Sequence, residues 1–157
     1  MIVLHSIEET EKLAVLIGEV AQPSDNLVLT GDLGAGKTTL TKGIAKGLGI
    51  DQMIKSPTYT IIREYPQGRI PLYHMDVYRV QEGALDLGLD EYFEGDGLSV
   101  IEWGNVLEEA LPLDYVELIL EKDAEDMGKR FVRFEAFGAQ ATRFKQAILD
   151  KWEQAYE

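Results

Sequence analysis

The sequence contains no cysteine, which excludes disulfide bonds, thiol nucleophiles and cysteine-based metal sites. It also lacks any apolar run near the roughly 20 residues that are needed to span a bilayer. The first ten residues, MIVLHSIEET, contain neither the basic segment nor the cleavable apolar core of a signal peptide. These absences fit a cytoplasmic protein.

Basic residues are scarce, because 15 Lys and Arg stand against 28 Asp and Glu and give a net charge of −13. A free-standing nucleic-acid binder needs a basic surface to neutralise phosphates, and this chain has no such overall balance. The stretch 81–126 holds 15 acidic residues and one basic residue, Lys122. It is either a solvated surface or an acidic face that docks on a basic partner protein.

Hydrophobic periodicity predicts a mixed α/β structure. Helices are expected over 6–21, 38–48, 83–93 and 140–157, and strands over 26–30, 58–65, 70–78 and 97–104. Residues 114–122 and 129–137 both alternate by twos around a polar turn, which predicts an antiparallel hairpin. With no repeat or linker in 157 residues, we expect a single domain over 1–157: a mixed central sheet with a C-terminal antiparallel hairpin and flanking helices.

The segment GDLGAGKT, residues 31–38, matches the phosphate-loop pattern G-x-x-x-x-G-K-[ST] at every fixed position. Glycines let such a loop curl so that its backbone N–H groups point at phosphate oxygens, and the following helix adds its positive end. Lys37 is expected to reach the β- and γ-phosphates, and the Thr38 hydroxyl to bind Mg²⁺. The residues predicted to contact the nucleotide here are Asp32, Leu33, Gly34, Ala35, Gly36, Lys37, Thr38 and Thr39.

Two acidic residues are candidates for the metal and the attacking water. Glu102 ends an apolar strand, where a second phosphate-site strand carries its acid, although Asp is the usual residue there. Asp76 lies within the apolar and aromatic stretch LYHMDVYR, where an unpartnered charge is costly to bury. If that stretch is a strand, His74 shares a face with Asp76, and a lone histidine there is more often structural.

The segment SPTYT, residues 56–60, follows the phosphate-loop helix. P-loop switch proteins have a threonine in this region that senses the γ-phosphate, so Thr58 and Thr60 are candidate sensors. A plain turn leading into a strand is the competing interpretation. Trp103 follows Glu102 directly, and the sequence does not decide between a core position and one beside the site.

Five segments, GDLGAGKTT, SPTYT, YHMDVYR, LGLDEYF and IEWG, occur in one order and at intervals that resemble a known family. It is the TsaE (YjeE) family of small P-loop ATPases, which act in bacterial N6-threonylcarbamoyladenosine biosynthesis in tRNA. The resemblance covers about residues 6–137, and its specificity lies in the combination of segments, since a P-loop alone is common.

The resemblance implies a P-loop NTPase-like fold and a weak, Mg²⁺-dependent ATPase with ATP and Mg²⁺ as cofactors. It implies catalytic roles for Lys37, Asp76 and Glu102, and metal binding by Thr38, Glu102 and Asp76. Ile7, Thr10, Gly128 and Arg130 would approach the adenine or the phosphates. The implied partner is a threonylcarbamoyl-transfer complex of TsaD and TsaB types, which acts on ANN-decoding tRNAs. The chain would meet tRNA only through that complex and would not bind membranes.

Three other functions stay open on the residues themselves. A small-molecule kinase could use the same loop, but residues 81–126 contain no arginine with which a lid could clamp a transferring phosphoryl group. A GTPase would need the guanine-reading sequence N-K-x-D, which is absent. A non-catalytic scaffold is disfavoured by Asp76 and Glu102.

Overall fold

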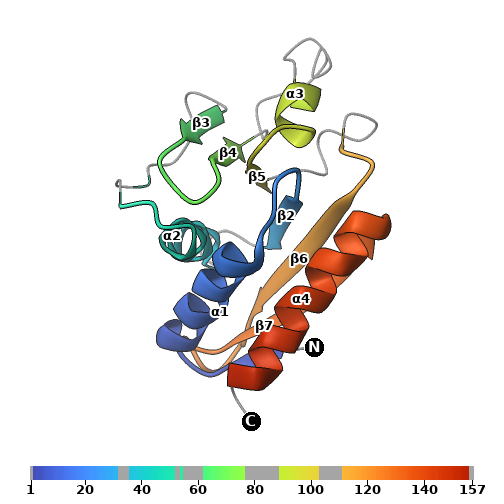
Figure 1. The fold of residues 1–157 in the computed structure, drawn as a ribbon. Helices are drawn as coiled ribbons and strands as arrows, with labels where there is room; N and C mark the ends of the chain where they lie inside the picture. The colour runs from blue at the N-terminus through green and yellow to red at the C-terminus, as the bar shows by residue number, and fades with distance from the viewer. Residues whose placement is uncertain are drawn as a thin grey trace.

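The computed structural model describes residues 2–31, 36–51, 54, 62–76, 89–102 and 111–155. Its strands are β1 (Ile2–Leu4), β2 (Asn26–Gly31), β3 (Ile62–Tyr65), β4 (Leu72–Asp76), β5 (Leu98–Glu102), β6 (Tyr115–Lys122) and β7 (Arg130–Phe137). Its helices are α1 (Ile7–Val20), α2 (Lys37–Gly47), α3 (Leu89–Phe93) and α4 (Ala139–Ala155). Figure 1 shows their arrangement.

All seven strands form one mixed sheet in the order β1-β7-β6-β2-β5-β4-β3. The four central strands, β6, β2, β5 and β4, are parallel, whereas β3, β7 and β1 pair antiparallel with their neighbours. The predicted fold class is therefore confirmed, including the antiparallel hairpin β6–β7. Strand β1 at one edge of the sheet was not expected from the sequence.

Two apolar clusters lie on opposite faces of the sheet. The larger cluster joins Leu27 and Leu29 of β2 with residues of α1, α2 and α4, among them Ile17, Ile44 and Phe144. The smaller cluster contains Val28 of β2 with α3 and its neighbours. Because successive side chains of a strand point to opposite faces, β2 is apolar on both sides, as a central parallel strand must be.

Helix α1 begins as expected but with one difference in its cap. Ser6 is the N-cap, and its side chain accepts a hydrogen bond from the backbone N–H of Glu9 at 3.2 Å. A reciprocal capping box would return the Glu9 carboxylate to the N–H of Ser6. Here the Glu9 carboxylate accepts from the N–H of His5 instead, at 2.7 Å. Glu9 therefore fixes the backbone one residue before the N-cap Ser6.

Helices α1 and α2 pack through small residues. A Cβ atom on Gly18 would overlap the carbonyl oxygen of Ile44, and one on Gly43 would overlap the Cβ of Ala14. A Cβ on Gly47 would meet the Val15 carbonyl oxygen. The backbones therefore approach so closely that α1 and α2 behave as one packed unit.

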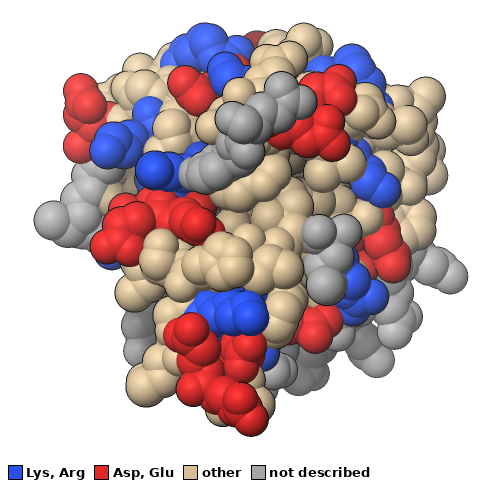
Figure 2. All heavy atoms as spheres, turned by 90° about the horizontal axis from the view of Figure 1, so that it is seen from below, with Lys and Arg blue, Asp and Glu red and all other residues tan. Residues whose placement is uncertain are grey.

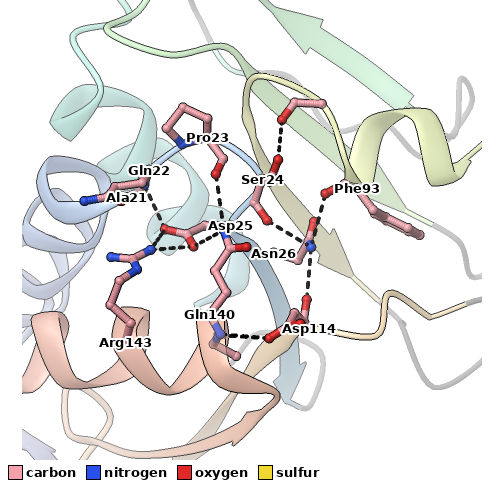
Figure 3. A network of polar contacts seen from close by, with 12 residues as sticks. Ala21, Gln22, Pro23, Ser24, Asp25, Asn26, Phe93, Asp114, Gln140 and Arg143 are labelled. Carbon is pink, nitrogen blue, oxygen red and sulfur yellow. Dashed lines mark hydrogen bonds and ion pairs between the residues drawn. The ribbon is translucent and has the colours of Figure 1, made fainter.

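A polar network fixes the amino end of β2 (Figure 3). Asp25 is 2% exposed, and its two carboxylate oxygens accept from Arg143 of α4 at 2.8 and 2.9 Å. Gln140 also donates to Asp25, at 3.1 Å, and the Asp114 carboxylate accepts from the first N–H groups of α4. The Arg143 side chain is 39% exposed, but its loss would leave the buried charge of Asp25 uncompensated, so this network ties α4 to the centre of the sheet.

Replacing Gly43 by alanine tests the helix contact. Glycine to alanine inside a helix normally stabilises it by about 1 kcal/mol. Here we expect Gly43→Ala to lower the free energy of unfolding by about 1–3 kcal/mol, because the new methyl group overpacks against Ala14. Urea denaturation measures the change, with the exposed α2 substitution Lys42→Ala as a control within about 0.5 kcal/mol of wild type.

A second substitution sharpens this test. Adding Ala14→Gly moves the methyl group from α1 to α2, and we expect it to restore part of the lost stability. A Gly43→Ala variant as stable as wild type, or no gain from the second substitution, would contradict the close approach of the two backbones.

Candidate functional site

The carboxyl ends of three parallel strands meet at one edge of the sheet. Asp76, the last residue of β4, lies directly opposite Glu102, the last residue of β5. Glu102 in turn lies opposite Leu29 of β2, two residues before the glycine-rich segment leaves that strand at Gly31. Because neighbouring strands are about 4.8 Å apart, both acids lie close to the point where the candidate phosphate loop begins.

The side-chain faces of these strands agree with a shared site. Leu72 and Val100 belong to the apolar cluster that contains α1 and α2. By the alternation of strand side chains, Asp76 and Glu102 project from that same face of the sheet, toward the side on which α2 lies. Both acids are partly exposed, as groups that meet a ligand must be.

The start of α2 is suited to an anion. Its N-cap, Gly36, has φ 115° in the left-handed region, which favours glycine, and no side-chain cap is recorded there. The first turn contains no acidic residue. Thr38 is exposed, while Lys37 and Thr39 are partly exposed. Uncapped N–H groups and the positive end of the helix together favour a phosphate at this position.

Several predicted residues lie outside the described part of the chain. These are Asp32, Leu33, Gly34 and Ala35 of the loop, the candidate sensors Thr58 and Thr60, and Trp103. Their predicted roles therefore stay predictions.

The oxygen donors at this edge fit magnesium. Hydroxyl and carboxylate oxygens, as on Thr38, Asp76 and Glu102, are the ligands that Mg²⁺ prefers, and it usually takes only one or two carboxylates with phosphate and water. Among the described residues no three His, Asp or Glu side chains gather into a complete metal cage.

His74 makes a contact that the sequence did not predict. Its Nε2 lies 2.6 Å from Oε2 of Glu102, and the ring is 2% exposed. The sequence suggested a structural histidine on the face of Asp76. The parallel register explains the contact, because His74 is opposite Val100 and Glu102 is two residues further along β5 on the same face. The available signal in the sequence was the two-residue spacing between His74 and Asp76, which places both side chains on the same face of the strand.

A second group of predicted residues lies where the β6–β7 turn approaches the start of α1. Gly128 of this turn lies next to the His5 carbonyl oxygen and the Cα of Ser6. Ile7 is 58% exposed and Met127 is 91% exposed, so two apolar side chains flank the contact in sequence. Figure 2 views the molecule from this lower side of Figure 1, and acidic and basic groups are interspersed around an uncharged central area.

Two other residues of this group have structural partners. Thr10 is buried, and its hydroxyl donates to the Ser6 carbonyl oxygen at 3.3 Å. Arg130 donates to the carbonyl oxygens of Met127 and Lys129 at 2.7 and 2.8 Å, so it holds the turn. The predicted contacts of these four residues with a nucleotide stay predictions.

Side-chain hydrogen bonds also order the β6–β7 turn. The Asp123 carboxylate accepts from the N–H groups of Glu125 and Asp126 at 2.8 and 3.3 Å. The backbone hydrogen bond from Glu125 is the main cause that lowers the pKa of Asp123 below its usual 3.8, with smaller contributions from Asp126 and Lys129. The turn is therefore preorganised beside α1.

A cavity of about 530 Å³ lies elsewhere, at the amino ends of the parallel strands. It is lined by Ser24, Asn26 and residues near α3 and Asp114, and by none of the residues predicted for the nucleotide. In the described part of the chain, no helix combines the length and apolarity required to cross a membrane.

Comparison with known proteins identifies relatives over most of the chain. Residues 4–132 match the family model described as "Threonylcarbamoyl adenosine biosynthesis protein TsaE". A protein of Bacillus subtilis named tRNA threonylcarbamoyladenosine biosynthesis protein TsaE is 50% identical over 131 residues, which cover 83% of this chain and 82% of that protein. A protein of Nostoc with the same name is 44% identical over 124 residues, covering 76% of each chain.

A solved structure agrees with these matches. The crystal structure of YdiB from Bacillus subtilis superposes with a TM-score of 0.84 and 41% sequence identity, covering 96% of this chain and 93% of that one. The similarity thus extends beyond the five sequence segments to the arrangement of the whole sheet and its helices.

Titration of Asp123 tests the order of the β6–β7 turn. We expect its pKa, followed by the carboxyl carbon shift in NMR, to lie below 3.8. The folded value is lowered, so the hydrogen bonds to the carboxylate persist above the unfolded pKa and weaken as the pH falls through the folded value. Lys129→Ala should leave the pKa low, because the backbone donors remain. A pKa at or above 3.8 in wild type would contradict this geometry.

Proposed function

The chain belongs to the TsaE family, and from this premise we propose that it is a weak Mg²⁺-dependent ATPase acting in threonylcarbamoyladenosine modification of tRNA. The observation that supports this proposal most is the register of the sheet. It brings Asp76 and Glu102 side by side at the edge where β2 runs into the glycine-rich segment. A nucleotide phosphate needs that combination of loop, helix end and paired acids.

In the proposed site each residue has a separate task. The N–H groups at the start of α2 and the Lys37 ammonium bind the phosphates. Thr38 and Glu102 hold the metal, which when bound neutralises charge that develops on the phosphate oxygens. Asp76 orients the attacking water. The water oxygen bonds to the γ-phosphorus as the bond to the bridging β-phosphate oxygen breaks, the water gives up a proton to the phosphate product or to solvent, and ADP and phosphate leave.

The adenine is proposed to lie between the start of α1 and the β6–β7 turn. Ile7 offers an exposed apolar side chain, and Gly128 lies next to the backbone of residues 5 and 6. Arg130 stabilises the turn through its two carbonyl contacts. A flat base beside an apolar side chain and a hydrogen-bonded turn fits the usual composition of small-molecule sites.

The proposed partner is the threonylcarbamoyl-transfer complex of TsaD and TsaB types, which performs the transfer to ANN-decoding tRNAs. ATP hydrolysis by this chain would let that complex cycle. The net charge of −13 supports a chain that reaches tRNA through the complex, since an acidic protein releases few counterions on binding nucleic acid by itself.

Substitution of Asp76 and of Lys37 separates binding from hydrolysis. Asp76→Asn should leave affinity for a fluorescent ATP analogue nearly unchanged and lower hydrolysis about 10²-fold or more, because the amide cannot orient the water as a carboxylate does. Lys37→Ala should weaken binding of the analogue roughly ten- to a hundred-fold, since it removes a charge-assisted hydrogen bond.

The same preparations need a stability control. Thermal melting is measured on every variant, with Arg133→Ala as a matched surface change, because Arg133 forms an exposed ion pair with Glu121. If hydrolysis by Asp76→Asn falls only in proportion to melting temperature, Asp76 is structural and the proposed role is wrong.

Activity with partners tests the pathway assignment. We expect slow ATP hydrolysis by the chain alone and a rise of about tenfold or more when the transfer complex is titrated in, because a partner can complete an unfinished phosphate site. The rise should shrink as salt increases, since acidic docking is screened. The isolated chain should bind tRNA weakly.

Two outcomes would redirect the assignment. Tight tRNA binding by the chain alone, or hydrolysis indifferent to the complex, would contradict the proposed cycle. A phosphorylated small molecule formed from ATP would favour a kinase on the same scaffold.

A further inference from the structure

The buried His74 forms a pair with the partly exposed Glu102 in the proposed site. The ring nitrogen Nε2 is 2.6 Å from Oε2 of Glu102, and the His74 side chain is 3% exposed against 13% for Glu102. An ionised carboxylate only accepts hydrogen bonds, so Nε2 is the donor. At this length and degree of burial the contact is a strong, charge-assisted hydrogen bond.

The second ring nitrogen indicates what the histidine is for. Nδ1 is buried and has no hydrogen-bond partner among the described residues. A histidine retained only to tie elements together would be expected to use both nitrogens, because an unsatisfied buried polar atom costs free energy. The polar contact recorded for this ring is instead directed at the acid proposed to hold the metal.

The effect of that bond on the carboxylate is geometric. With Oε2 engaged by His74, the Glu102 carboxylate cannot rotate freely about its last bond. Oε1 then remains the oxygen best placed to accept a metal ion or a water of its shell. Partners of this kind orient metal ligands, and their loss typically weakens metal binding 10- to 100-fold.

We propose that His74 is a positioning residue for magnesium: its Nε2–H holds Oε2 of Glu102 so that the carboxylate is preset for the cation. This inference rests on the proposed function, because it requires Glu102 to bind the metal. It goes beyond that function by assigning a role to a residue that contacts neither phosphate nor metal.

Two amide substitutions distinguish positioning from simple packing. Glutamine can place its amide nitrogen near the position of Nε2, whereas asparagine places it near that of Nδ1. His74→Leu removes the donor and puts an apolar side chain in the buried position of the ring. The readout is the Mg²⁺ concentration for half-maximal binding of a fluorescent, non-hydrolysable ATP analogue. Mn²⁺ binding in the presence of that analogue, followed by electron paramagnetic resonance, is a second readout.

We expect His74→Leu and His74→Asn to raise the half-maximal Mg²⁺ concentration by about tenfold or more. His74→Gln should restore it to within a few-fold of wild type. Binding of the analogue without divalent cation should be unchanged in all three variants. In a Glu102→Gln background, His74→Leu should have little further effect, because the two residues act through one carboxylate.

The controls separate three results. If wild type binds the analogue with no dependence on Mg²⁺, the proposed function and this inference both fail. If wild type depends on Mg²⁺ and the His74 variants match it, with only their melting temperature lowered, His74 is structural and this inference alone fails. Should His74→Leu not fold, the contrast between His74→Gln and His74→Asn decides, and equal Mg²⁺ dependence of these two overturns the proposal.

Discussion

The parallel pairing of β2 with a strand on each side is the constraint on which the rest of the molecule depends. A strand in that position must be apolar on both faces, and all of its backbone groups must be satisfied by its neighbours. The two ends of β2 therefore differ in what surrounds them. The amino end is held by the buried Asp25 and its contacts with α4. At the carboxyl end the glycine-rich segment leaves the sheet at Gly31.

Close packing of α1 and α2 extends this constraint to the proposed site. Small residues at the contact, Gly18 and Gly43 among them, let the backbones touch, so α2 cannot shift without α1. The start of α1 lies against the β6–β7 turn, which supplies the proposed adenine side. The phosphate side and the base side of the site are thus linked by rigid helix packing. A nucleotide that spans the start of α2 and the β6–β7 turn, as proposed, would meet two elements whose relative position is already fixed, which lowers the entropic cost of binding.

The sequence predicted the class of fold and most of its elements because their signals are local. Residues 31–38 match a dense motif, the hairpin alternates by twos, and Ser6 caps α1 as expected. Element ends moved by a residue or two, as at α2, which starts at Lys37. The three-residue strand β1 has no periodic signal and exists through pairing with β7. The contact of His74 with Glu102 depends on the register of β4 and β5, which no local pattern encodes.

The presence of a glutamate, Glu102, at the end of β5 gives a physical reason for its contact with His74. Glutamate has one more rotatable bond than aspartate, the usual acid at this position of a P-loop site, so more side-chain entropy is lost when it is held in one geometry. The hydrogen bond from the buried His74 ring orders the Glu102 side chain during folding. Part of this entropy is therefore already lost before a cation binds. Its register partner Asp76 is the shorter acid and loses less side-chain entropy when it is ordered. The longer acid and the histidine two residues before Asp76 therefore belong to one arrangement, in which the fold itself orders the proposed metal ligand.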